Sequence, residues 1–295
     1  MDARKTLGGP ARMLSKFFSK LIGLLSSIAR MMVLSSVSVA IKSKKSATTK
    51  KYGKCTLLAN GPSLKNALDN NEVILENVDI MCVNMFCKSP YFPQIKPRYY
   101  FLTDQEFFFP TTERTRHFVE ELKEAFAKVD WPMFLVTCTN CRKGEILDCV
   151  KSNSNIKILI SNCSAFSSFD CIDHFMYRIR MAMPRCQTVT NFALMSAINM
   201  GYSTIYLYGA DHSWTKDLRV DDDNIVCYGD RHVYKKELEE IKIEYNIAAL
   251  LRAYAHMFES HYKIQKYAES EFTRVLNLTK ESFIDAYERK EYLYE

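Results

Sequence analysis

The segment Asn60-Gly61-Pro62-Ser63 combines residue types that could bind a phosphate group. It follows a short apolar run, 55–59, which predicts a buried strand, and the Asn-Gly-Pro sequence stops that strand abruptly. Ser63 then stands where an N-cap residue would begin a helix. A strand that turns tightly into a helix presents free backbone N–H groups and the positive end of the helix dipole, which suits a phosphate. An ordinary strand–helix turn without a ligand is the alternative.

Polar residues also follow three other apolar runs. The run 204–208 leads into Gly209-Ala210-Asp211-His212, the run 78–83 ends at Asn84, and the run 99–102 ends at Thr103-Asp104. In a doubly wound parallel sheet, ligands bind outside the carboxyl ends of the strands. We therefore expect these strand ends to join the Asn60 turn in one ligand site.

Two histidines are candidates for a general base. His232 lies in the polar segment 215–232, close to Tyr228, and this segment is typical of a mobile lid over a site. His212 is the rival, because it directly follows a predicted strand and adjoins Asp211, which could orient it. A surface histidine without a catalytic task is the alternative for His232.

Metal-binding patterns are weak in this chain. The run Asp221-Asp222-Asp223 resembles the Asp-x-Asp of metal-dependent glycosyltransferases, but it ends no predicted strand, and carboxylates in a loop are usually solvated. Cys138 and Cys141 form a single C-x-x-C with no second pair at zinc-ribbon distance. We expect no metal site, and we expect the ten cysteines to be reduced, as in a cytoplasmic protein.

Charge is distributed unevenly along the 295 residues. Residues 1–54 hold twelve Lys and Arg against one acid, a net charge of +11, whereas the whole chain carries +6, so the remainder carries −5. The 47% apolar content is enough for a substantial core. A mildly acidic body argues against a nucleic-acid-binding protein.

The N-terminal region predicts a membrane-associating tail. Residues 11–33 place apolar and basic side chains at helical spacing. The stretch 21–41 is apolar enough to suggest a membrane span, but Arg30 and several serines disfavour insertion, so a helix lying in the membrane interface fits better. We expect a linker at 42–51 and a tail that ends at 53. A disordered basic tail is an alternative, and a cleaved signal peptide fits less well.

Residues 54–290 predict one α/β domain, a Rossmann-like, doubly wound and mainly parallel sheet. Further strands are expected at 133–137, 156–160 and 273–278, and helices at 64–70, 112–129, 188–200, 234–267 and 279–287. The helix at 188–200 begins at Thr188-Val189-Thr190-Asn191 and ends at Gly201. A lid is expected at about 212–235.

Four short motifs, in this order, resemble two related families. They are Asn60–Leu64, Val83–Phe86, Thr188–Asn191 and Ile205–Asp211. The chain resembles the bacterial CMP-sialic-acid-dependent lipooligosaccharide sialyltransferases and the MptE-like family, named for 6-hydroxymethylpterin diphosphokinase. The likeness covers about residues 54–280.

The sialyltransferase resemblance implies roles for individual residues. Asn60, Gly61 and Ser63 would hold the donor's phosphate and nucleotide, Asn84 would face the donor, and Thr188, Thr190 and Asn191 would contact the nucleotide. Tyr228 and His232 resemble the family's tyrosine and its histidine general base, although their spacing is four instead of three. Asn191 stands where the family has glycine. The resemblance implies transfer without a metal or other cofactor.

Three functions are open at this point. The first is a sialyltransferase-like glycosyltransferase that acts at the cytoplasmic membrane face. It moves a sugar, CMP-linked by the resemblance, to a hydroxyl of a cell-surface glycan or glycolipid. The second is a diphosphokinase that uses ATP on a pterin alcohol and would need Mg²⁺ on Asp104 and Asp211. The third is a non-catalytic membrane scaffold. The cationic N-terminus favours the first over the second, and the oligomeric state is left open.

Overall fold

The computed structural model describes residues 9–46, 53–230, 239–243 and 245–289. Seven parallel strands form its central sheet in the order β10-β6-β1-β2-β3-β4-β5. The strands are β1 (Lys54–Leu58), β2 (Asp79–Val83), β3 (Tyr99–Phe101), β4 (Met133–Cys138), β5 (Ile156–Ser161), β6 (Thr204–Tyr208) and β10 (Arg274–Asn277). The predicted Rossmann-like α/β fold is therefore confirmed.

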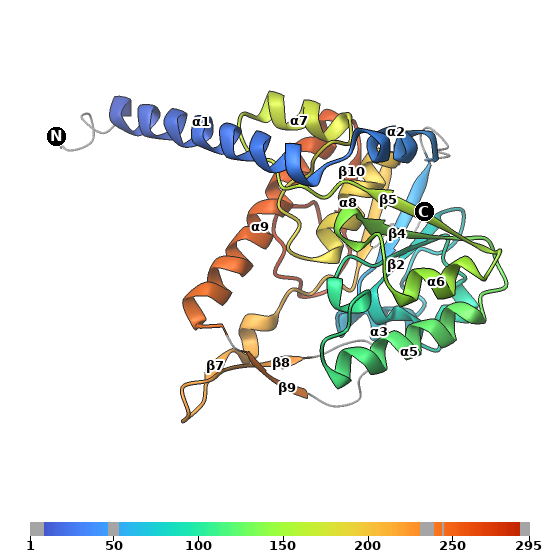
Figure 1. Cartoon of the computed structure of the whole chain (residues 1–295). Coiled ribbons are helices and arrows are strands. Elements are labelled where there is room, and N and C mark those ends of the chain that lie inside the picture. Colours follow the sequence, from blue (N-terminus) through green and yellow to red (C-terminus); the bar gives the residue numbers. More distant parts are fainter. Residues whose placement is uncertain (1–8, 47–52, 231–238, 244, 290–295) are drawn as a thin grey trace.

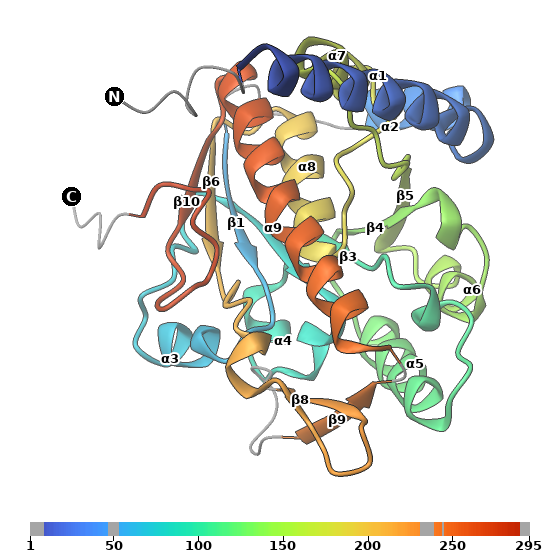
Figure 2. The ribbon, with the colours of Figure 1, turned by 90° about the vertical axis from the view of Figure 1, so that its left-hand side faces the viewer.

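Helices cover both faces of this sheet (Figures 1 and 2). The chain crosses from β1 outward to β5 and then returns to place β6 beside β1. Because crossovers between parallel strands are right-handed, this reversal puts the two sets of helices on opposite faces. The first set is α3 (Ser63–Asp69), α4 (Phe92–Ile95), α5 (Glu113–Ala127) and α6 (Glu145–Lys151), and the second is α8 (Val189–Met200) and α9 (Ile247–Ser270).

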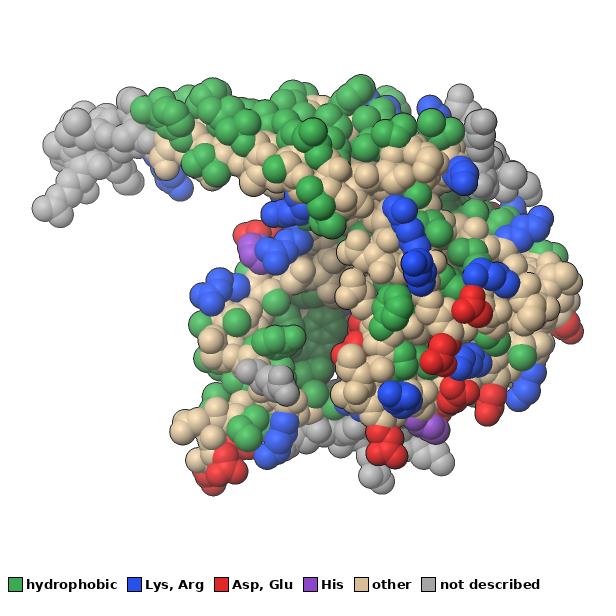
Figure 3. Space-filling model, viewed as in Figure 1, with side chains coloured by type: hydrophobic (Ala, Val, Ile, Leu, Met, Phe, Trp, Pro, Cys, Tyr) green, Lys and Arg blue, Asp and Glu red, His purple; other side chains and the backbone are tan. Residues whose placement is uncertain are grey.

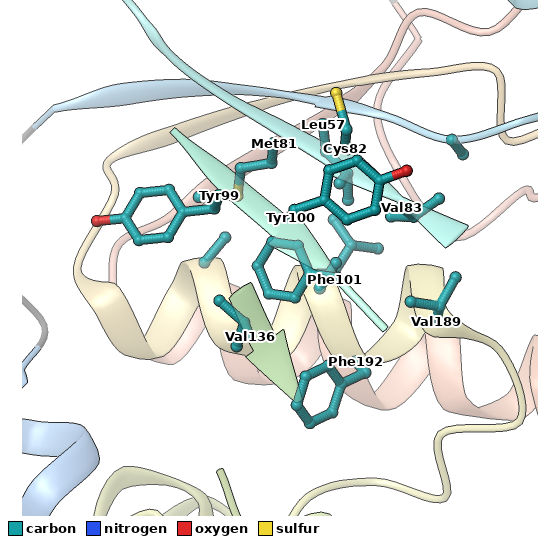
Figure 4. Close-up of a cluster of buried hydrophobic side chains, with 14 of the residues drawn as sticks. Leu57, Met81, Cys82, Val83, Tyr99, Tyr100, Phe101, Val136, Val189 and Phe192 are labelled. Atoms are coloured by element: carbon teal, nitrogen blue, oxygen red, sulfur yellow. The ribbon is translucent and has the colours of Figure 1, made fainter. Parts of the chain in front are cut away.

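The core lies between the sheet and these helices. The central strands are continuous apolar runs because a parallel sheet buries both of its faces. Figure 4 shows Phe101 of β3 in one buried cluster with Val189 and Phe192 of α8. The rings of Phe101 and Phe192 lie 6.1 Å apart in an edge-to-face arrangement. Almost all of α8 is buried, so its ends are fixed relative to the strands.

The N-terminal region is helical and packs on the domain. It forms α1 (Gly9–Leu34) and α2 (Val37–Ser46), so the linker expected at 42–51 is wrong at least as far as residue 46. Two of the serines that seemed to disfavour membrane insertion, Ser27 and Ser35, make specific contacts with the domain. Ser27 Oγ accepts from the Ser167 N–H at 3.1 Å, and the Ser35 hydroxyl donates to the Met181 carbonyl at 2.7 Å.

The outer side of α1 and the start of α2 carry exposed apolar side chains, which gather along the top of the molecule in Figure 3. We call this set the apolar stripe: Met13, Leu14, Phe17, Phe18, Ile22, Leu25, Met32, Val33, Leu34, Val37 and Ile41. The segment Arg12–Leu34 is long and apolar enough to cross a bilayer, judged by length and composition alone.

Three expectations for the C-terminal third are corrected. The expected irregular segment 215–232 contains η4 (Trp214–Asp217), β7 (Arg219–Val220) and β8 (Val226–Asp230), and β8 pairs with β9 (Glu239–Ile243) in an antiparallel sheet of order β7-β8-β9. The long helix expected at 234–267 is therefore wrong in its first part, because β9 pairs with β8 and Asn246 caps α9 only afterwards. No helix forms at 279–287, because the buried Asn277 amide holds this loop through Ser282 and the Ile284 carbonyl. Three short helices, α4, α6 and α7 (Asp170–Arg178), were not predicted.

Candidate functional site

The site lies where β1 and β6 separate the two halves of the sheet. The chain leaves these neighbouring strands toward opposite faces, which creates the crevice in which open α/β sheets bind ligands. The turns after both strands remain hydrogen-bonded, with the Gly61 N–H donating to the Gly209 carbonyl at 2.8 Å. A Cβ at Gly61 would lie 1.9 Å from Asp211 Oδ2, so only glycine allows this close approach.

Asp211 occupies the helix N-terminus at which we expected a phosphate. Pro62 precedes the helix, and Ser63 is the first residue of α3, so the N-cap expected at Ser63 is wrong. The Ser63 hydroxyl donates to Asp211 Oδ2 at 2.8 Å, and its backbone N–H donates to Oδ1 at 3.3 Å. Burial raises the pKa of Asp211, and these hydrogen bonds from Ser63 oppose the rise. The Asp211 carboxylate thus takes the position at the N-terminus of α3 where we expected a phosphate.

A cavity of about 920 Å³ opens at these strand ends. It brings together ten of the predicted site residues from β1, β2, β3, β6, α8 and β8: Asn60, Gly61, Asn84, Thr103, Asp104, Thr188, Thr190, Asp211, His212 and Tyr228. Figure 3 shows the molecule deeply hollowed beneath α1. Ser63 and Asn191 are not among the lining residues, and His232 lies outside the described residues.

The N-terminus of α8 opens on this cavity. Thr188 caps the helix by accepting from the Asn191 N–H at 3.3 Å, and Thr188, Val189 and Thr190 line the cavity. Asn191 is fully buried, and its Nδ2 has no hydrogen-bond partner among the described atoms. The first N–H groups of a helix and its positive dipole end favour an anion. The N-terminus of α8 therefore suits a phosphate. Asp211 supplies a carboxylate at the N-terminus of α3, but the described residues supply none at α8.

Asn84 lines the cavity and carries an unused polar atom. Its backbone adopts the left-handed conformation, with φ of 46°, which asparagine tolerates better than most residues. Its carbonyl accepts from the Tyr100 hydroxyl. Its side-chain Oδ1 is buried without a partner among the described residues. Such an orphaned acceptor is costly unless a ligand donates to it.

His212 is held in a buried histidine pair. Its Nε2 lies 3.2 Å from His261 Nε2, and His261 Nδ1 lies 2.8 Å from the Tyr287 hydroxyl. Burial lowers the pKa of His212 to about 3 and lowers the pKa of His261 well below its usual range. Both rings are therefore neutral at physiological pH, and His212 is a weak base. His261 and Tyr287 are 49 and 75 positions away in the chain, so sequence spacing gave no sign of this pair.

Aromatic and basic side chains that the sequence did not single out complete the wall. Trp214 and Tyr254 stack with ring centroids 5.7 Å apart, and both line the cavity beside Tyr228. Burial raises the pKa of Tyr254 to about 12. Among the described lining residues, Arg114 of α5 is the only Lys or Arg. Trp214 follows the predicted strand-end segment by two residues, whereas Arg114 and Tyr254 come from distant helices whose sequences carry no motif.

Thiols line another part of the cavity. All ten cysteines are free, and Cys138 Sγ and Cys141 Sγ lie 3.6 Å apart. A hydrogen bond with Cys141 raises the pKa of Cys138 to about 11, so this thiol is protonated at neutral pH. The described residues contain no group of three or more His, Cys, Asp or Glu that could hold a metal ion. Asp221 of the acidic run instead accepts from the Ile225 N–H at 2.8 Å and from Lys242 at 3.0 Å, closing the β7–β8 turn.

Comparisons with known proteins bear on the fold. No family model matches the chain, and no curated protein sequence matches it. Among solved structures, a MAf glycosyltransferase from Magnetospirillum magneticum AMB-1 is similar, with a TM-score of 0.51 at 13% identity. The similarity covers 83% of this chain and 34% of that one, so the chain spans about a third of that protein's length. At this identity the likeness establishes a shared α/β fold, and the kinship with sialyltransferases and MptE-like proteins stays a resemblance.

Proposed function

We propose that this protein is a glycosyltransferase that transfers a sugar from a nucleotide-sugar to a hydroxyl of a glycan or glycolipid. The observation that carries the proposal is the strand-end cavity of about 920 Å³, lined by eight of the residues predicted for donor binding and by two of the predicted catalytic residues, His212 and Tyr228. Its place at the reversal of strand order is the usual ligand position of such sheets. The structural neighbour named as a glycosyltransferase supports the same class.

In this proposal the donor's phosphate lies at the N-terminus of α8. Thr188 and Thr190 line the cavity there, and the helix dipole supplies positive potential. The orphaned Oδ1 of Asn84 suits an amino or hydroxyl donor of the nucleotide or sugar. The stacked Trp214 and Tyr254 offer an aromatic face to a base or a sugar ring. That the nucleotide is CMP, and the sugar a sialic acid, rests on the sequence resemblance.

The proposed chemistry is a displacement at the anomeric carbon. The acceptor hydroxyl oxygen bonds to this carbon as the bond to the donor's phosphate oxygen breaks, and a base takes the hydroxyl proton. We assign the base to His232 and assistance at the departing phosphate to Tyr228, which lines the cavity. The low pKa of His212, about 3, and its contact with His261 argue against the rival assignment.

The alternatives have less support. A diphosphokinase would need Asp104 and Asp211 to hold Mg²⁺. The Asp211 carboxylate already binds Ser63, and Asp104 accepts from the Glu106 N–H at 3.1 Å. A scaffold without catalysis gives no reason for the buried, orphaned Asn84 Oδ1 at the cavity.

We further propose that the protein is peripheral at the cytoplasmic face of the cell membrane. The apolar stripe would enter the interface, as the exposed hydrophobic face of an amphipathic helix does. The contacts of Ser27 and Ser35 with the domain favour an interfacial helix over a span, because a span would have to leave the domain surface.

Turnover with a panel of CMP-, UDP- and GDP-sugars tests the proposal. We expect one donor to be consumed with release of its nucleotide, and His232→Ala to slow turnover by roughly a hundredfold with little change in nucleotide affinity. His256→Ala, at a half-exposed position of α9, is the matched control and should keep its rate. Consumption of ATP and a pterin alcohol, with no sugar-donor turnover, would contradict the proposal. Near-normal turnover by the His232 variant would remove that residue from the mechanism.

A further inference from the structure

A second cavity lies beside the main one, against the C-terminal end of α1. It measures about 400 Å³, and we call it the arginine cavity because Arg30 of α1 and Arg185, three residues before Thr188, both line it. It shares Asn140 and Cys163 with the main cavity, so the two spaces adjoin. The proposed function assigns no role to this cavity.

The two guanidinium groups have no acidic partner among the residues that the structure describes. Arg30 donates to the Ala165 carbonyl at 3.4 Å, and neither arginine forms an ion pair with a residue that the structure describes. No Asp or Glu is among the described residues that line the cavity. An anion that binds between two positive charges is attracted by both, and the planar guanidinium suits a phosphate.

The arginine cavity also meets the apolar stripe. Leu34 belongs to both, since it is 41% exposed on the outer side of α1 and lines the cavity. Figure 3 shows the hydrophobic side chains along the top of α1 and the hollow beneath the helix. The apolar stripe and the arginine cavity therefore match a molecule with an apolar tail and an anionic headgroup. The tail would lie at the stripe and the headgroup at the two arginines.

We propose that the arginine cavity binds the phosphate-bearing headgroup of a membrane lipid that carries the acceptor hydroxyl. This rests on the proposed function and names the acceptor's class. With its tail in the membrane beside α1, the lipid's phosphate lies between Arg30 and Arg185. Its polar portion extends past Asn140 and Cys163 into the main cavity, where the donor lies.

Titration of the full-length protein with monomeric dioctanoyl phosphatidic acid tests this binding. Wild type should bind it saturably, and Arg30→Gln/Arg185→Gln should weaken binding at least about tenfold, because two charge-assisted hydrogen-bonding groups are lost. Arg12→Gln/Lys16→Gln removes the same charge from exposed positions of α1 outside the cavity, and should bind as wild type does. Dioctanoylglycerol, which has no phosphate, should bind weakly and equally to all three proteins.

Two outcomes would overturn the proposal. One is equal affinity of the three proteins for phosphatidic acid. The other is binding of glycerol 3-phosphate as tight as that of phosphatidic acid, which would identify a soluble phosphate ester as the ligand. Arg185→Gln alone, at an exposed residue, repeats the test if the double variant does not fold. Donor turnover is measured separately, so its absence would refute the proposed function without deciding the lipid titration.

Discussion

Lowering the pH should destabilise this protein through the buried pair of His212 and His261. The folded-state pKa of His212, about 3, lies below the roughly 6.5 of an unfolded histidine. The neutral ring therefore favours the folded state, so its contribution is complete above about pH 6.5 and is lost as the pH falls toward 3. At pH 5 the unfolded ring has taken up its proton and the folded ring has not.

The size of the effect follows from the pKa difference. Each pH unit below about 6.5 costs about 1.4 kcal/mol, so His212 alone should remove about 2 kcal/mol of unfolding free energy between pH 7 and pH 5. His261 should add a loss of the same sign, because burial also lowers its pKa. A loss of this size is a large share of the stability of an ordinary domain.

Urea unfolding of wild type and His212→Asn between pH 7 and pH 5 measures the effect. Asparagine tolerates the positive φ of 51° at this position and does not titrate. The variant should lose about 2 kcal/mol less than wild type over this range. His117→Asn, on the exposed side of α5, should follow wild type. Parallel curves for wild type and His212→Asn would refute the reasoning.

Three further predictions concern the turn at Gly61, the apolar stripe and the metal independence of sugar transfer. Gly61→Ala should lower the unfolding free energy by about 3 kcal/mol or more, because its Cβ would displace Asp211 from Ser63; a loss below about 1 kcal/mol in urea unfolding would contradict this. Ile22→Ser/Leu25→Ser should weaken sedimentation with anionic vesicles about tenfold or more, whereas Phe272→Asn, also exposed, should not; equal sedimentation would contradict the membrane proposal. Sugar transfer should persist in excess EDTA, and its loss and recovery with added Mg²⁺ would contradict metal-independent transfer.

The sheet and the gathering of the site could be predicted because both follow from local patterns. Apolar runs such as 78–83 and 204–208 have no polar face, which identifies strands buried on both sides. Parallel strands place their carboxyl ends on one edge, so the polar residues after them had to meet. The strand ends meet at this edge whatever the order in which the strands pair.

The remaining features depend on contacts between distant residues. The Asp211 carboxylate reaches Ser63 across 148 positions, and nothing near Ser63 indicates that its hydroxyl is already used. Likewise β9 forms only because β8 lies beside it, and its charged sequence has no apolar run of its own. In the sequence, Ser27 and Ser35 look like polar interruptions of an apolar helix. The structure shows that Ser27 accepts from the Ser167 N–H and that Ser35 donates to the Met181 carbonyl.

The affinity of the protein for nucleotides tests the central claim most directly. Calorimetric titration with CMP, UDP, GDP and ATP would compare wild type, Thr188→Val and Thr112→Val, because Thr188 and Thr112 both cap helices, but only Thr188 lines the cavity. Each variant should lose about 1 kcal/mol of stability with its cap. We predict that one nucleotide binds wild type and Thr112→Val alike and binds Thr188→Val about tenfold more weakly. Equal binding by the two variants, or no binding of any nucleotide to wild type, would contradict a nucleotide site at the N-terminus of α8.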